Sequence, residues 1–121
     1  THSSPTAMSG MKLGTATTEA SKTGAGSYIA AGDYVSGSAH AQEAGWPKAG
    51  ATNDIAQWKV IWAAGQATAN NINRVAIVDN TTDAGEADGS HTLAIAVFGA
   101  AINKGASDTL TVTWDITFLG A

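Results

Sequence analysis

The chain has 121 residues, a formal net charge of −4 and no cysteine. Its length predicts one domain, and the absence of cysteine excludes a disulfide scaffold and a cysteine-based zinc site. The six lysines and arginines provide no basic patch for phosphates, so we expect no nucleic-acid partner. No apolar run approaches the roughly 18 residues that span a bilayer, so we expect no membrane partner either.

The apolar composition predicts a small core. Hydrophobic residues make up 44% of the chain, but 25 of them are alanine and only 28 are larger apolar side chains. A domain of this size ordinarily buries more large apolar surface. We therefore expect contacts outside the chain to supply part of its stability.

Residues 1–27 are rich in serine, threonine, glycine and alanine. One interpretation is a flexible terminus; the other is an extended arm that orders on a neighbouring subunit. On the second interpretation, the chain divides into an N-terminal arm over 1–27 and a single β-domain over 28–121. The residues then expected to contact other subunits are Thr1, His2, Pro5, Met8, Met11 and Leu13 of the arm, together with Trp46.

Strand signals follow along the rest of the chain. Residues 28–47 are interrupted by glycines, which predicts short strands or extended loop. Four further runs either alternate apolar and polar residues or are apolar runs of strand length. They lie at residues 57–62, 72–78, 92–98 and 109–118. We expect the second run to be buried on one face and half-buried on the other, and residues 103–108 to form a loop. The last run is the clearest, because its threonines alternate with large apolar residues over ten positions.

These runs are separated by turn signals, and no segment has the apolar stripe of an amphipathic helix. The predicted fold is all-β, an antiparallel β-sandwich or a jelly-roll-like barrel, with an extended N-terminal arm. Trp58, Trp62 and Trp114 fall on the apolar side of their strands, so we expect them in the core. Trp46 precedes Pro47 in a loop and is the better candidate for an exposed aromatic side chain.

Motifs of catalysis are missing from the sequence. The histidines have no metal-ligand spacing, and neither a G-x-S-x-G nor a nucleotide-binding glycine motif occurs. We therefore expect no enzyme, no cofactor and no metal. The acidic stretch Asp79, Asp83, Glu86 and Asp88 leaves two alternatives open, a calcium site and an ordinary solvated loop. Asp115 is better explained by solvent or a cross-strand partner than by an acid–base pair of carboxylates.

Four stretches together resemble a family of small tailed-phage virion proteins, usually labelled tail fibre or minor tail proteins. They are the loop G-W-P-K-A-G-A-T-N at 45–53, Q-W-K-V-I-W-A-A at 57–64, I-N-R-V-A-I-V-D at 72–79 and the closing I-N-K-G-A-S-D-T-L-T-V-T-W-D-I-T-F at 102–118. The resemblance covers roughly residues 45–118. It implies an all-β, non-enzymatic virion building block that is used in many symmetric copies.

Within a virion, a capsid decoration (cement) protein fits better than a tail or fibre component, because the chain is short and has no repetitive shaft. The expected partners are other copies of the chain, for which a trimer is one arrangement, and major capsid or tail proteins. The expected location is the virion, assembled in the cytoplasm of a bacterial host. Two alternatives stay open: a cell-surface filament or pilus subunit assembled through the N-terminal arm, and a β-sandwich module that binds a glycan through Trp46.

Overall fold

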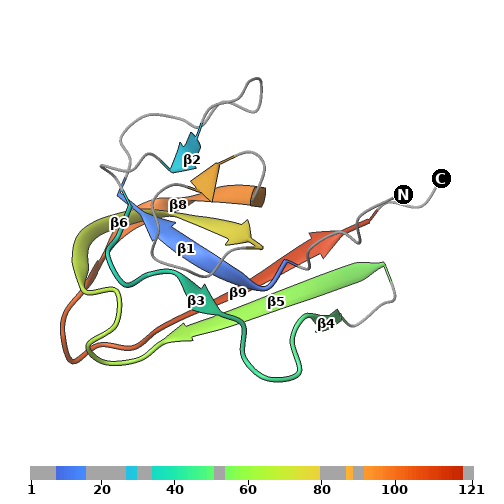
Figure 1. Ribbon diagram of the computed structural model, residues 1–121, viewed down its shortest axis with the longest axis horizontal. Helices are drawn as coiled ribbons and strands as arrows, with labels where there is room; N and C mark the ends of the chain where they lie inside the picture. Colours follow the sequence, from blue (N-terminus) through green and yellow to red (C-terminus); the bar gives the residue numbers. More distant parts are fainter. Residues whose placement is uncertain are drawn as a thin grey trace, which may run out of the picture.

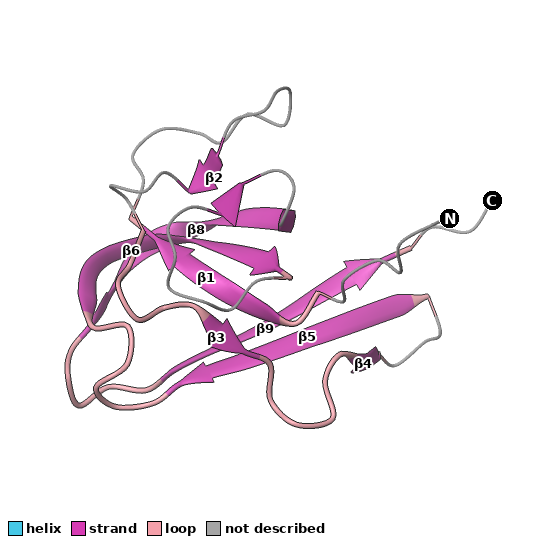
Figure 2. Cartoon of the chain, viewed as in Figure 1, coloured by secondary structure: helices cyan, strands magenta, loops and turns pink. Residues whose placement is uncertain are grey.

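The computed structural model describes residues 8–15, 27–29, 34–50, 54–79, 87–88 and 92–118. Within these ranges the secondary structure is entirely β (Figures 1 and 2), and no helix of membrane-spanning length and apolarity occurs. The strands are β1 (Gly10–Gly14), β2 (Ser27–Ile29), β3 (His40–Ala41), β4 (Lys48–Ala49), β5 (Ile55–Trp62), β6 (Ala69–Val78), β7 (Ala87–Asp88), β8 (Thr92–Lys104) and β9 (Leu110–Thr117).

Two antiparallel sheets pack on each other. The larger has the strand order β3-β1-β6-β8, and the smaller has the order β4-β5-β9. A separate two-stranded sheet pairs β2 with β7. The predicted antiparallel β-sandwich is therefore confirmed. The barrel alternative is not, because β8 and β9 are edge strands of different sheets and do not pair among the described residues.

In the smaller sheet, β5 and β9 pair along their whole length, from Ile55 opposite Thr117 to Trp62 opposite Leu110. Alternation sends every second side chain toward the larger sheet. As predicted, Trp58 and Trp62 are buried in the core, while the threonines of β9 are exposed. The inward row of β9 packs on the core but is only half-buried; it comprises Leu110, Val112, Trp114 and Ile116.

In the larger sheet, the second half of β6 is buried on both faces. Its residues from Arg74 to Val78 are all buried, so the prediction of one half-buried face is wrong. The strand is central, with β1 on one side and β8 on the other. β8 also continues to Lys104, past its predicted end at Phe98 and into the predicted loop.

The predicted N-terminal arm is wrong over residues 10–14, which form β1 in the middle of the larger sheet. Every residue of β1 is buried. Met11 and Leu13 are fully buried in the core, so their side chains contact their own chain and not a neighbouring subunit. The physical reason is that β1 pairs with β6 over its whole length, which places Met11 and Leu13 on the core face of the sheet. The other parts of residues 1–27 include many positions outside the described residues.

Ser38 completes the hydrogen bonding of β1 where β3 ends. β3 pairs with β1 only at Gly10 and Met11. At Leu13, the backbone N–H instead donates to Ser38 Oγ at 3.0 Å, and the Leu13 carbonyl accepts from the Val35 N–H at 3.0 Å. The Ser38 carbonyl accepts from Trp62 Nε1 at 2.9 Å. Through these hydrogen bonds, Ser38 connects β1 of the larger sheet with β5 of the smaller sheet.

We expect Ser38→Ala to lower the free energy of unfolding by about 1–3 kcal/mol, because it leaves the buried Leu13 N–H without its acceptor. Urea denaturation measures the change. Ser36→Ala is the matched control, since Ser36 lies in the same turn and is exposed. Equal stability of the two variants would contradict the assigned role of Ser38.

Candidate interaction surface

The loop that carries Trp46 is fixed to the edge of the smaller sheet by backbone hydrogen bonds. The Glu43 N–H donates to the Lys59 carbonyl at 3.0 Å, and the Trp46 N–H donates to the Glu43 carbonyl at 3.1 Å. Further along, the Gly50 N–H donates to the Ile55 carbonyl at 2.8 Å. A Cβ on Gly50 would lie 2.7 Å from a side-chain carbon of Ile55, so the loop can return this closely only with glycine at position 50.

Two lysine side chains lie close to the Trp46 ring, in a protein whose net charge is −4. Lys48 Nζ lies 4.1 Å from the centroid of the Trp46 ring, and Lys59 Nζ lies 5.7 Å from it. Both distances are typical of cation–π contacts. The other lysines and arginine in the described part of the chain, Lys12, Arg74 and Lys104, are buried. The solvent-facing positive charge of the described residues is therefore concentrated around one half-buried tryptophan.

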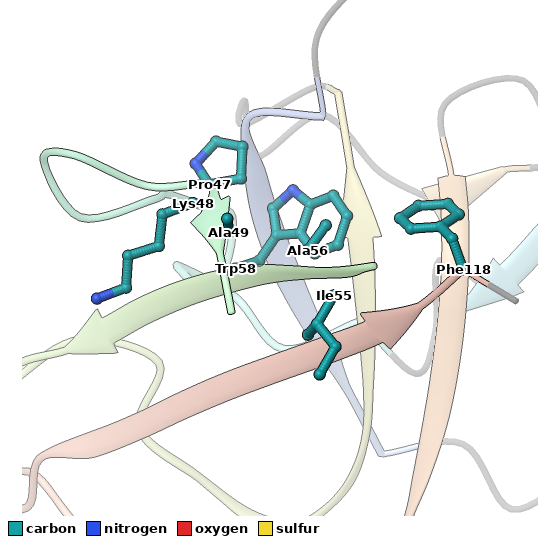
Figure 3. A pocket seen from close by; sticks show the side chains of 7 residues that line it. All are labelled: Pro47, Lys48, Ala49, Ile55, Ala56, Trp58 and Phe118. Atoms are coloured by element: carbon teal, nitrogen blue, oxygen red, sulfur yellow. The ribbon is translucent and has the colours of Figure 1, made fainter. Parts of the chain in front are cut away.

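A shallow apolar hollow lies beside this loop, at one end of the smaller sheet (Figure 3). Its volume is about 350 Å³, and its walls are Pro47, Lys48, Ala49, Ile55, Ala56, Trp58 and Phe118. Figure 3 shows the Phe118 ring on the same side of β5 as Trp58, whereas the Lys48 side chain extends away from it. Phe118 is 60% exposed. Such a lining suits contact with an apolar group rather than acid–base or nucleophilic chemistry.

A second surface is formed by the two edge strands β8 and β9, which we call the open flank (residues 92–104 and 110–118). The strands lie in different sheets and are joined through the turn after Lys104 (Figure 1). On the other side of the sandwich β5 packs against β1 and β3, but among the described residues no comparable packing joins β8 to β9. Large apolar side chains are exposed here: Leu93 at 49%, Val97 at 60% and Phe118 at 60%.

The residues predicted to contact other subunits are spread over different environments. Thr1, His2 and Pro5 lie outside the described residues. Met8 is half-buried against the core, and its carbonyl accepts from Gln42 Nε2 at 2.7 Å and from Trp58 Nε1 at 3.3 Å. Met11 and Leu13 are core residues, as described above. Trp46 is half-buried on the surface, so of the predicted set it is a residue that remains available for contact.

The other polar candidates form no catalytic or metal-binding group in the part of the chain that the structure describes. No cluster of three or more histidines, cysteines or carboxylates occurs there. Asp83 and Glu86 of the acidic stretch fall outside it, so the calcium alternative stays a prediction. Asp115 accepts from Gln57 Nε2 at 2.9 Å across the β5–β9 pair and is also exposed, so it has both the cross-strand partner and the solvent that the sequence leaves open.

Lys48, Lys59 and Phe118 belong to these surfaces although the sequence does not mark them as site residues. A weak signal exists for the lysines, because both lie within a short stretch around Trp46 in a chain with few cations. For Phe118 the periodicity predicts an inward side chain, but it lies directly after β9 and is 60% exposed, with no described strand covering it.

We compared the chain with protein-family models, with curated proteins and with solved structures. None of the three comparisons gives a match. The resemblance to tailed-phage virion proteins over residues 45–118 therefore stays a prediction from the sequence.

Proposed function

We propose that this chain is a non-enzymatic structural protein of a tailed-phage virion that acts by associating with neighbouring subunits. The observation that carries the proposal is the open flank, where large apolar side chains lie exposed on Leu93 and Val97. Exposed apolar surface of this kind marks sites of protein association. The sequence resemblance supplies the virion as the setting.

Within the virion, a capsid decoration protein is the form that we favour. The described strands make a single small sandwich, and the sequence has no repeats from which a fibre shaft could be built. A compact unit with apolar contact surfaces suits binding at many equivalent positions of a shell. A tail or fibre-associated protein is the second form of the same proposal.

Quantitative mass spectrometry of purified virions tests this proposal. We expect the chain to co-purify with particles of the phage that encodes it, at a copy number comparable with that of the major capsid protein. A copy number far below that of the capsid protein would favour the tail form. Absence of the chain from purified particles, with the chain present in the infected cells, would contradict the proposal.

The two alternatives fit the structure less well. Strand donation from the N-terminus requires apolar residues that another subunit can take up, but β1 already lies between β3 and β6 of its own chain. A glycan would need a free face of Trp46, and Lys48 Nζ lies over that ring. If a glycan quenched the tryptophan fluorescence of the unaltered chain but not that of Trp46→Ala, the result would support the glycan-binding alternative.

A further inference from the structure

We infer that a second copy of this chain covers the open flank, so that the edge strands β8 and β9 form the contact between copies. This inference rests on the proposed function, because it identifies the partner of the surface that carries that proposal.

The two sides of the sandwich differ in how their edges are protected. On one side the edge strands β3 and β4 are each two residues long, and β4 contains the exposed Lys48 directly after Pro47. Short strands, lysine and proline are devices that prevent pairing with another molecule. On the other side β8 has 13 residues and β9 has eight, and both contain neither proline nor an exposed lysine. Among the described strands of the sandwich, the long edges without proline or exposed lysine are therefore both on the open flank, where β9 pairs regularly with β5 and β8 shifts its register on β6 at three places.

The middle of β8 is irregular, because the register on β6 shifts between the pairs Ile72–Ile102 and Arg74–Val97. Gly99, Ala100 and Ala101 are consecutive exposed residues with small side chains or none. A Cβ added to Gly99 would meet no atom of the described residues within 4 Å, so none of them fills the space beside it. Small side chains let another backbone or sheet come near, while Val97 and Leu93 provide apolar contacts next to them.

The charge of the flank selects a second copy over a charged partner. From Thr92 to Asn103 the strand β8 has no charged residue, and Lys104 is buried with its Nζ donating to the Ala63 carbonyl at 3.0 Å. In β9 the only charge is Asp115, which is hydrogen bonded to Gln57. Two copies of net charge −4 would repel each other elsewhere, but β8 brings no charge to this contact and β9 brings only Asp115.

Hydrogen bonding and apolar area point to the same partner. Each edge strand has one side of its backbone without a strand neighbour in the described residues. A partner for it must offer a free edge and a neutral apolar surface, and this chain has both in one place. Because a symmetric pair uses the same patch on both subunits, one flank can match another flank.

The test compares the same substitution at the two edges of one sheet. Ala100→Arg places a cation on the open flank, and Ala41→Arg places one on β3 at the opposite edge; both alanines are exposed. We expect the full chain to form a dimer or larger oligomer by native mass spectrometry and sedimentation. Ala100→Arg should weaken association by at least about tenfold, because each copy then brings a charge into the contact. Ala41→Arg should associate like the unaltered chain.

Circular dichroism and thermal melting establish that both variants are folded, and Gly99→Val serves as a second flank variant that adds bulk without charge. A monomeric unaltered chain, or equal association of the Ala100→Arg and Ala41→Arg variants, would overturn the inference. The outcome is separable from that of the virion experiment. A chain that is abundant in virions but monomeric in solution would support the proposed function and refute this contact. A chain that associates through the flank but is absent from virions would support this contact and refute the proposed function.

Discussion

Leu13→Asp is expected to prevent the domain from folding. Leu13 is fully buried in β1, its side chain packs in the core, and its backbone is held by Ser38 and Val35. Removing a buried leucine side chain alone costs about 2–5 kcal/mol. An uncompensated carboxylate in the core adds several kcal/mol more, so the sum approaches the roughly 5–15 kcal/mol by which a domain is stable.

Far-UV circular dichroism and limited proteolysis measure this effect, with Leu93→Asp as the matched control. Leu93 is 49% exposed on β8, so the same substitution there places the carboxylate in water. We expect a folded Leu93→Asp variant and an unfolded Leu13→Asp variant. A cooperative melt of Leu13→Asp would contradict the burial of β1 and return residues 10–14 to the arm that the sequence predicts.

The periodicity of the sequence predicts those elements of the fold that have large side chains at alternate positions. In β9, threonine alternates with Leu110, Val112, Trp114 and Ile116, and the structure has the same alternation of exposed and half-buried residues. In β5, Trp58 and Trp62 fix which face is inward. Such strands specify their own orientation, because a shift by one residue would expose every large side chain.

β1 and the second half of β8 could not be predicted in this way. β1 has only Met11 and Leu13 among glycines and a lysine, and it is a strand because β6 pairs with it from far along the sequence. In β8, Gly99, Ala100 and Ala101 give no periodic signal, yet the strand continues through them to Lys104. Both segments depend on long-range pairing rather than on local preference.

The candidate interaction surfaces were predicted only in part. The sequence identifies Trp46 as an exposed aromatic candidate, but it does not show that Lys48 and Lys59 lie near its ring. It also predicts which residues of β9 face inward, but not whether another strand covers them. That depends on the relative position of two edge strands, which no single alternating segment encodes.

The second large effect is expected for Trp62→Ala. Trp62 is fully buried between the sheets, and its Nε1 donates to the Ser38 carbonyl. Loss of a buried tryptophan costs about 3–5 kcal/mol through lost burial and the remaining cavity. The small apolar content of the chain leaves few neighbouring side chains that could move in to fill the space.

Urea denaturation of Trp62→Ala and Trp46→Ala compares the loss of stability at a core tryptophan with that at a surface tryptophan. We expect Trp62→Ala to be unfolded or strongly destabilised. Trp46→Ala should lose about 1 kcal/mol or less, because its ring is only half-buried and its contacts with Lys48 and Lys59 are cation–π contacts at the surface. If the two variants were equally stable, Trp62 would not be the residue that joins the sheets. If Trp46→Ala were the less stable variant, the loop around Trp46 would be part of the core rather than a surface for contact.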